Sequence, residues 1–422
     1  MPCWTPPNRR PSIARSPVAP IRITSTSSTW TKSRSPTCPE TPRACGSRRS
    51  AICCWRAAMG RELRVEDLPD LARGAALLGT GGGGDPYLGW MMVREEYRRG
   101  RTVELVDPEE IAGDTLVIPT AGMGAPTVRI EKLPRGTEAA AALRALERHL
   151  GRRADATMPL ESGGSNSMVP LLVGAQLGLP VVDADGMGRA FPELQMVTFA
   201  VYGIPGSPMA FSGAHDEHGI IDTGADNRRL ERLARAVTVR MGGTANIAHY
   251  SMSGAQVRRT AIRNTLTLAL RVGRCLRESR DRHRDPLQEL TALFKETDYG
   301  YAAPVFTGRI IDVERATVGG FARGKALIKS FGGDSVLELT FQNEHLLARI
   351  DGRVRVVVPD LITVLNAETA EPITTEALRF GQRVTIYAIS APPIMRTPAA
   401  LAVFGPRAFG FELDFRSVEE LT

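Results

Sequence analysis

The chain has 422 residues, of which 43% are hydrophobic and 23% charged, an ordinary composition for a globular protein of two or three domains. No uninterrupted apolar run reaches the roughly 18 to 20 residues that a membrane-spanning helix needs. The net charge of +7 would suit nucleic-acid binding, but residues 1–58 carry 10 basic residues against one acid, whereas the rest carries 43 against 45. We therefore expect neither nucleic-acid nor membrane binding.

Residues 1–58 differ from the rest of the chain. They hold five of the six cysteines and three of the four tryptophans, are rich in Pro and Ser, and show no helical or strand periodicity. We interpret them as a disordered or misassigned extension, with translation starting at Met59. The remaining cysteine, Cys275, lies in a helical pattern, which argues against a disulfide framework and favours a reduced, cytoplasmic location.

From residue 65 onward, helical and strand patterns alternate. Apolar spacing predicts helices over 65–79, 86–99 and 138–150, and short runs of apolar residues predict strands over 102–106, 115–119, 179–185 and 195–201. This alternation indicates an α/β layer domain with a parallel or mixed sheet, which we assign to residues 59–238.

The second predicted domain covers residues 239–422. Its first part, 252–296, is helical, with a long helix over 257–275 and a shorter one over 287–294. Its second part, 303–415, is mostly β, with strands over 305–313, 336–341, 345–350, 353–358 and 383–389, and Asp351-Gly352 predicts a hairpin turn. The fold class is therefore α/β, with a C-terminal domain that starts helical and ends mostly β.

A glycine run, LGTGGGGDPY at 78–87, follows the first helix. Gly79, Gly81 and Gly84 fit the dinucleotide pattern G-x-G-x-x-G, but that fingerprint requires a strand before the first glycine, so we expect no nucleotide cofactor. Asp85 and Pro86 are typical of a helix start. Amides at a helix N-terminus bind anions, so the run predicts an anion site.

Three further clusters of polar residues and glycines fall in loops of the predicted α/β domain. Glu131 and Lys132 follow the glycine-containing segment 122–127, Glu161 and Asn166 flank a pair of glycines, and the third cluster holds Asp183, Asp185 and Arg189. Carboxylates here could act as general bases or ligands of a hard metal, and Lys132 and Arg189 could hold a substrate carboxylate. The alternative for each cluster is a turn with capping acids and solvated ion pairs.

Other chemical motifs are incomplete. The cluster His215-Asp216-Glu217-His218 lacks the H-E-x-x-H spacing of zinc proteases and adjoins Gly219, which favours a surface turn. Ser165 lacks the final glycine of a nucleophile elbow, so serine hydrolase chemistry is not supported.

Several motifs together resemble the S-methyl-thiohydantoin desulfurase-like family, which is found beside hydantoinase/oxoprolinase proteins. They are LGTGGGGDPY at 78–87, GAPTVRIEK at 124–132, ESGGSN at 161–166, VVDADGMGRAFPELQM at 181–196, FQNEHLL at 341–347, PDLI at 359–362 and GPRAFG at 405–410. The resemblance spans 65–415 and implies an N-terminal α/β domain, a C-terminal domain, and hydrolytic removal of sulfur from a thiohydantoin to leave a hydantoin. The alternatives are hydrolysis of another cyclic amide, or an accessory, ligand-binding subunit for a hydantoinase/oxoprolinase partner.

We assign residue roles from the steps that hydrolysis of a thiohydantoin requires. Water must be deprotonated, developing charge held, and the leaving thiol protonated. We expect Asp183 or Asp185 to act as the general base or as ligands of a divalent metal, with Glu161 as partner acid. Substrate binding is assigned to Gly82, Gly83, Gly84, Asp85, Glu131, Lys132, Asn166 and Arg189, which suits a small anionic heterocycle. We also expect a homo-oligomer, and Gly82 to Gly84 close to Glu161 and Asp183.

Overall fold

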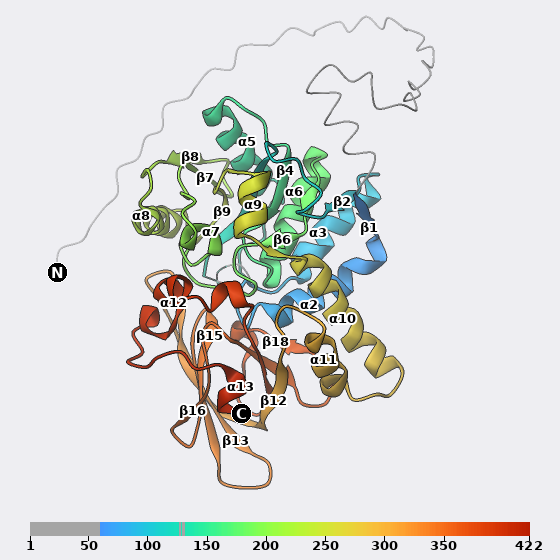
Figure 1. Cartoon of the computed structure of the whole chain (residues 1–422), viewed down its shortest axis with the longest axis vertical. Coiled ribbons are helices and arrows are strands. Elements are labelled where there is room, and N and C mark those ends of the chain that lie inside the picture. Colours follow the sequence, from blue (N-terminus) through green and yellow to red (C-terminus); the bar gives the residue numbers. More distant parts are fainter. Residues whose placement is uncertain (1–59, 126–127, 129–130) are drawn as a thin grey trace, which may run out of the picture. The chain divides into compact units, whose positions relative to one another are not determined.

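The computed structural model describes residues 60–125, 128 and 131–422, in which an N-terminal α/β sheet is followed by helices and an antiparallel sheet (Figure 1). The predicted extension over 1–58 lies outside the described residues. None of the helices in the described ranges is long and apolar enough to cross a membrane.

The first sheet is mixed. Its strands run in the order β1-β2-β5-β4-β3-β9-β7-β8, with β10 paired to β3. The central neighbours β2, β5, β4 and β3 are parallel, and the remaining pairs are antiparallel. The strands are β1 (Arg61–Leu63), β2 (Val103–Val106), β3 (Leu116–Gly124), β4 (Ala156–Pro159), β5 (Val181–Val182), β7 (Met209–Ser212), β8 (His218–Ile221), β9 (Thr244–Ala248) and β10 (Met252–Ser253).

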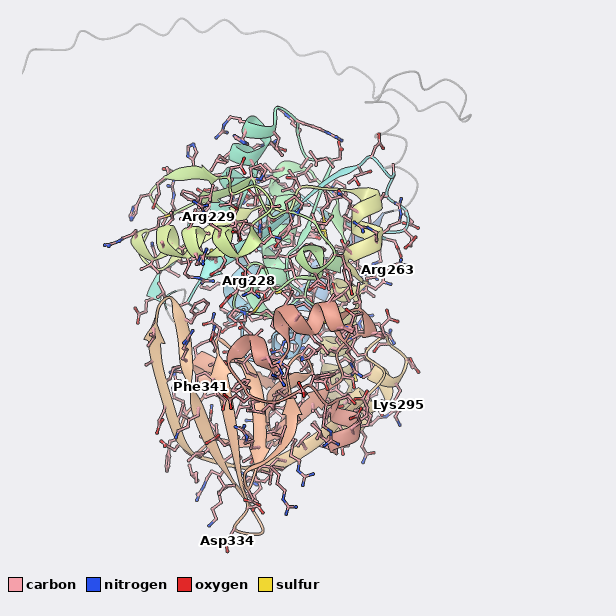
Figure 2. All side chains as sticks on the ribbon, turned by 60° about the vertical axis from the view of Figure 1, so that its left-hand side comes forward. Arg228, Arg229, Arg263, Lys295, Asp334 and Phe341 are labelled. Atoms are coloured by element: carbon pink, nitrogen blue, oxygen red, sulfur yellow. The ribbon has the colours of Figure 1, made fainter. Side chains whose placement is uncertain are left out.

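Helices pack on both faces of this sheet. Successive residues of a strand point to opposite faces, so neighbouring residues of β3 contact different helices. Ile118 of β3 packs in one cluster with α5 (Glu138–Leu150) and α6 (Met168–Leu177). Its neighbour Val117 packs in another cluster with α8 (Asn227–Arg240) and α9 (Gly254–Thr260). Figure 2 shows Arg228 and Arg229 on α8.

Two helices approach each other closely beside the glycine run. The helix α2 (Leu68–Leu78) follows the 3₁₀ turn η1 (Val65–Asp67) and packs on α10 (Thr265–Asp281). Gly74 and Gly273 make this contact possible, since a Cβ at either would lie 1.7 Å from a carbonyl oxygen of the other helix. After the run, α3 (Tyr87–Arg98) begins, and α11 (Pro286–Lys295) follows α10.

The second sheet is antiparallel, in the order β16-β15-β14-β13-β12-β19-β17-β18. Leu361 and Leu365 pack in one cluster with α2, α10 and α11, whereas Ile362 and Val364 lie in another. Asp334 marks the turn between β13 and β14 (Figure 2). The strands are β12 (Ala302–Val318), β13 (Phe321–Ser330), β14 (Val336–Gln342), β15 (Glu344–Ile350), β16 (Arg353–Val357), β17 (Leu361–Asn366), β18 (Pro372–Ile373) and β19 (Arg383–Ile389).

The remaining elements are short. They are β6 (Ala184–Asp185), which pairs with β11 (Ile262–Arg263), and η2 (Gly164–Ser167), α7 (Thr198–Val201), η3 (Thr375–Ala377), η4 (Pro393–Met395), α12 (Pro398–Phe404), η5 (Pro406–Phe409) and α13 (Val418–Leu421). Three of them, η3, η4 and η5, are 3₁₀ turns near the C-terminus.

Two predicted elements were wrong. The segment 195–201 is no strand, because a helical turn, α7, occupies its second half. The long helix predicted over 257–275 is two helices, since Ala261 has an extended backbone, Ile262 pairs with Asp185, and Asn264 takes a left-handed φ of +57°. The predicted hairpin turn is confirmed, with φ of +48° at Asp351 and +79° at Gly352.

Candidate active site

The carboxyl ends of β3 and β4 lie side by side in the parallel part of the first sheet. Residues Gly122 to Gly124 end β3, and Glu161 follows β4 by two residues. Carboxyl ends of parallel strands are where open α/β sheets bind ligands. The topology therefore brings the glycine segment of β3 and Glu161 to one edge.

The glycine run packs its backbone against the loop that follows Glu161. Gly83 and Gly84 have φ of +72° and +77°, conformations that suit glycine. A Cβ on Gly83 would lie 2.3 Å from the carbonyl oxygen of Gly163, and the Ser165 amide donates to the carbonyl oxygens of both Gly83 and Gly84, at 3.0 and 2.9 Å. Glycine is thus needed because two backbones touch here.

The amides of the run differ in availability. The Gly82 amide donates to the Gly79 carbonyl at 2.8 Å, whereas the amides of Gly83 and Gly84 have no protein acceptor within the described ranges. Asp85 accepts from the Tyr87 amide at 2.8 Å and so caps α3. Two free amide donors therefore remain where the sequence predicts an anion site.

Gly83 and Gly84 border a small cavity of about 50 Å³. Its wall contains buried polar side chains from the N-terminal domain, Glu161 and Asn166, and from the second sheet, Asn343 and Glu344. Its lining includes Gly122, Met123, Gly124, Leu160, Glu161, Asn166, Met187, Phe191, Pro192, Glu193, Leu194, Arg235, Asn343 and Glu344. We call it the carboxylate cavity, after Glu161 and Glu344.

Glu161 is held in a hydrogen-bond network. Its carboxylate accepts from the side-chain amide of Asn166 and from the backbone amide of Phe191, the latter at 3.3 Å. Asn166 is in turn fixed on β3, since its side-chain oxygen accepts from the Gly122 amide at 2.8 Å. The network sets the orientation of the Glu161 carboxylate relative to the glycine run.

Glu344, at the start of β15, was not assigned a role from the sequence. It is 3% exposed, and its Oε2 has no hydrogen-bond partner among the described residues. Gly82 packs against its side chain, where a Cβ would lie 2.1 Å from Oε1. Burial raises the pKa of Glu344 well above its usual value, and the nearby charge of Glu161 raises it further, whereas Arg189 opposes the shift. Its only sequence signal is its place in FQNEHLL.

Arg189 is fully buried, and its guanidinium bonds to backbone carbonyl oxygens and to one side-chain hydroxyl. Its guanidinium donates to the carbonyl oxygens of Asp360 and His345 at 2.7 and 2.8 Å and to Thr80 Oγ1 at 2.9 Å. Burial lowers the pKa of Arg189, while the Glu344 carboxylate acts in the opposite direction. Arg189 therefore ties the glycine run to the second sheet and offsets the buried carboxylates, rather than presenting a free fork to a ligand.

Asp183 and Asp185 are not among the described residues that line the carboxylate cavity. Asp183 accepts from the amides of Leu266 and Thr267 at the start of α10, at 2.8 and 3.1 Å, and from the Thr267 hydroxyl. Asp185 accepts from the amides of Ser162 and Gly188 at 2.7 and 2.9 Å. Both carboxylates thus fix backbone segments, and burial raises the pKa of both, that of Asp185 to about 7.

Asp183 and Asp185, which the sequence suggested as metal ligands, do not form a ligand cluster in the described residues. The two aspartates are bonded to backbone amides, and no group of three His, Cys, Asp or Glu side chains placed to hold a metal is found in the part of the chain that the structure describes. His215 to Glu217 lie in the turn between β7 and β8, where Asp216 pairs with Arg135 at 2.6 Å.

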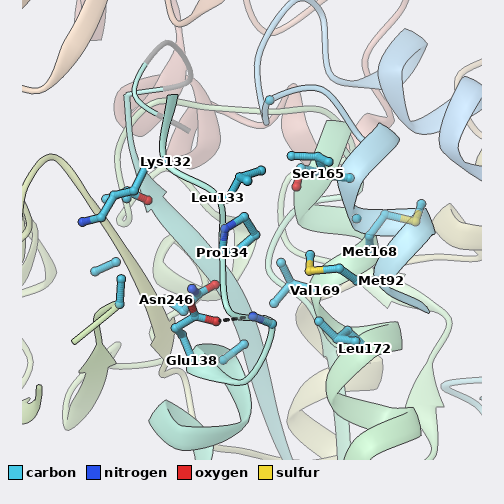
Figure 3. Close-up of a pocket in the computed structure, with 18 of the residues that line it drawn as sticks. Met92, Lys132, Leu133, Pro134, Glu138, Ser165, Met168, Val169, Leu172 and Asn246 are labelled. Carbon is cyan, nitrogen blue, oxygen red and sulfur yellow. Dashed lines mark hydrogen bonds between the residues drawn. The ribbon is translucent and has the colours of Figure 1, made fainter. Parts of the chain in front are cut away.

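A second, larger pocket of about 260 Å³ lies next to the carboxylate cavity, and both are bordered by Gly84. Figure 3 shows its labelled wall residues, among them Lys132, Met168 and Asn246. The Lys132 ammonium donates to the Met241 carbonyl at 3.1 Å. Glu131 is exposed and is not among the described lining residues of either space. Part of the motif 124–132 lies outside the described residues.

These features define an α/β protein in which two buried carboxylates line one cavity with two amides that have no acceptor in the described part of the chain. The chain belongs to the S-Me-THD-like family: the family's N-terminal domain matches residues 66–223 and its C-terminal domain matches 225–418. This is the family of the S-methyl-thiohydantoin desulfurase-like proteins that the motifs indicated.

Comparison with solved structures supports the fold. A protein from Chromobacterium violaceum, solved by X-ray crystallography, matches with a TM-score of 0.73 and 24% identity, over 85% of this chain and 100% of that one. At this identity the likeness concerns the fold alone. A search of curated proteins found no match.

Proposed function

We propose that the protein hydrolyses the carbon–sulfur bond at C2 of a thiohydantoin, most directly an S-methyl-thiohydantoin, to give a hydantoin and methanethiol. Family membership supports a thiohydantoin-related function. The observation that carries the proposal is the pair of buried carboxylates, Glu161 and Glu344, on one cavity with the amides of Gly83 and Gly84, which have no acceptor within the described ranges.

The reaction needs a base and an acid. Water attacks C2 while Glu161 accepts one of its protons, and the tetrahedral intermediate then loses the sulfur substituent, which takes a proton from Glu344 and leaves as methanethiol. The C2 hydroxyl proton moves to the ring nitrogen to give the hydantoin, and proton exchange with water restores both carboxyl groups. Glu344 suits the acid because burial and the nearby Glu161 carboxylate raise its pKa, which favours the protonated form. Two carboxyl groups whose surroundings give them different proton affinities can divide acid and base roles in this way.

The glycine run supplies the electrostatic part. Negative charge develops on the ring as water adds, and the amides of Gly83 and Gly84 are held by the backbone contacts with residues 163–165 before the substrate arrives. Donors that are fixed in advance stabilise such charge at no cost of rearrangement. Asn166 positions Glu161 and does not itself need to touch the ring.

The direct test is thiol release by the purified protein alone from a synthetic S-methyl-thiohydantoin, followed with a thiol-reactive dye. We expect methanethiol and the matching hydantoin in equal amounts. Release only after a hydantoinase/oxoprolinase partner is added would favour the accessory-subunit alternative. Ring opening of a hydantoin without thiol release would favour hydrolysis of a cyclic amide.

A further inference from the structure

The larger pocket adjoins the carboxylate cavity along one strand pair. Gly122 and Gly124 line the cavity, and their antiparallel partners on β9, Asn246 and Thr244, line the pocket. Gly84 borders both spaces. A ring held at Gly84 with C2 toward the carboxylates would therefore direct one of its other substituents into the pocket.

Apolar side chains dominate the pocket wall (Figure 3). Met168 and Leu172 of α6 are buried residues of its lining, and three other lining residues, Tyr87, Leu88 and Leu133, are exposed by 56%, 38% and 74%. Exposed apolar groups gathered around one concavity are typical of a ligand site and not of an ordinary surface. The wall therefore offers uncovered apolar area to a ligand.

The charged groups of the pocket are largely committed to the protein. Glu138 accepts from the amides of Arg135 and Gly136 at 2.7 and 2.8 Å, Asp85 caps α3, and Lys132 donates to a backbone carbonyl. Two acids face one base, so a carboxylate substituent would meet more repulsion than attraction. The lining thus disfavours an anionic substituent, although the sequence alone suggested an anionic ring.

The volume fits a substantial group. A cavity of about 150 Å³ can hold benzene, and this pocket measures about 260 Å³. We infer that the pocket, built around Met168, Leu172 and Leu133, binds a bulky apolar substituent at C5 of the ring. The substrates would then be thiohydantoins with a branched aliphatic or aromatic side chain. This inference rests on the proposed function.

A substrate series tests it. We would compare kcat/KM for methanethiol release from four S-methyl-thiohydantoins that carry hydrogen, carboxyethyl, isobutyl or benzyl at C5. We expect the isobutyl and benzyl compounds to exceed the other two by about 10- to 100-fold. Equal or faster turnover of the unsubstituted or carboxyethyl compound would overturn the inference.

A variant of Leu133, an exposed residue of the larger pocket, tests whether the C5 substituent binds there. Leu133→Asp should lower the ratio of benzyl to unsubstituted kcat/KM at least tenfold. The matched control is Phe380→Asp, since Phe380 is 76% exposed and is not among the described pocket residues. It should leave the ratio unchanged. An unchanged ratio in Leu133→Asp, with both variants folded, would contradict the assignment.

Binding separates this inference from the proposed function. Absence of thiol release from all four compounds would contradict the function but not the pocket. Calorimetric titration with 5-benzylhydantoin and with unsubstituted hydantoin then decides: at least tenfold tighter binding of the benzyl compound, lost in Leu133→Asp, supports the pocket, and equal binding overturns it.

Discussion

Replacing Asp183 by Ala distinguishes a structural from a catalytic carboxylate. The change removes the acceptor for the Leu266 and Thr267 amides and for the Thr267 hydroxyl. Loss of a helix cap costs about 0.5–2 kcal/mol, and a buried donor left unpaired costs about 1–3 kcal/mol. We therefore expect the free energy of unfolding to fall by about 3 kcal/mol in Asp183→Ala.

Asp183→Asn is the matched variant, because its side-chain oxygen can still accept from the two amides at the start of α10. We expect a loss of about 1 kcal/mol or less. Urea unfolding followed by circular dichroism measures both variants, and thiol release measures turnover by the folded fraction, which should stay within threefold of wild type. Loss of turnover by more than 100-fold in Asp183→Asn, with unchanged stability, would refute the structural role and return Asp183 to the chemistry.

Two further predictions concern buried groups near the site. Burial raises the pKa of Asp185 from 3.8 to about 7, so the native state binds the proton more tightly and the free energy of unfolding should decrease by about 3 kcal/mol as pH rises from 4 to 7. Asp185→Asn should lack this decrease, and parallel pH profiles of variant and wild type would contradict it. Gly81→Ala places a Cβ 2.5 Å from the His345 ring and Thr375 Oγ1, at a φ of +87°. Its control, Gly381→Ala, has the same backbone strain at +88° with nothing within 4 Å; we expect unfolding costs of about 1 kcal/mol for the control and at least about 2 kcal/mol more for Gly81→Ala. An equal loss of unfolding free energy in the two variants would show that the His345 ring and Thr375 move aside for the new Cβ, and would contradict the prediction.

Local patterns predicted the elements whose stabilising contacts are also local. The helix α5 matches its prediction at both ends, because Leu143, Leu146 and Leu150 form one stripe and Gly151 ends the helix with a φ of +64°. The helix before the glycine run is also confirmed. The break between α9 and α10 was not predictable from spacing, since the pairing of Ile262 with Asp185 joins segments far apart in sequence.

The candidate site shows the same limit. Glycines and acids that follow parallel strands are visible in the sequence, and the structure brings Gly83, Gly84, Glu161 and Asn166 to one cavity. Glu344 comes from the second sheet, and neither spacing nor composition places it opposite Glu161. The roles of Asp183 and Asp185 could not be read either, because a buried acid beside glycines looks alike in sequence whether it fixes backbone amides or carries a reaction.

The most direct test of the central claim is kcat for methanethiol release by Glu344→Gln, compared with wild type across pH. We predict a loss of about 10²- to 10⁴-fold, and wild-type activity that decreases as rising pH deprotonates Glu344, a decrease that Glu344→Gln lacks. The matched control, Glu338→Gln, changes a more exposed acid on the neighbouring strand β14 and should keep wild-type kcat. A folded Glu344→Gln protein with kcat within tenfold of wild type and the same pH profile would contradict the account.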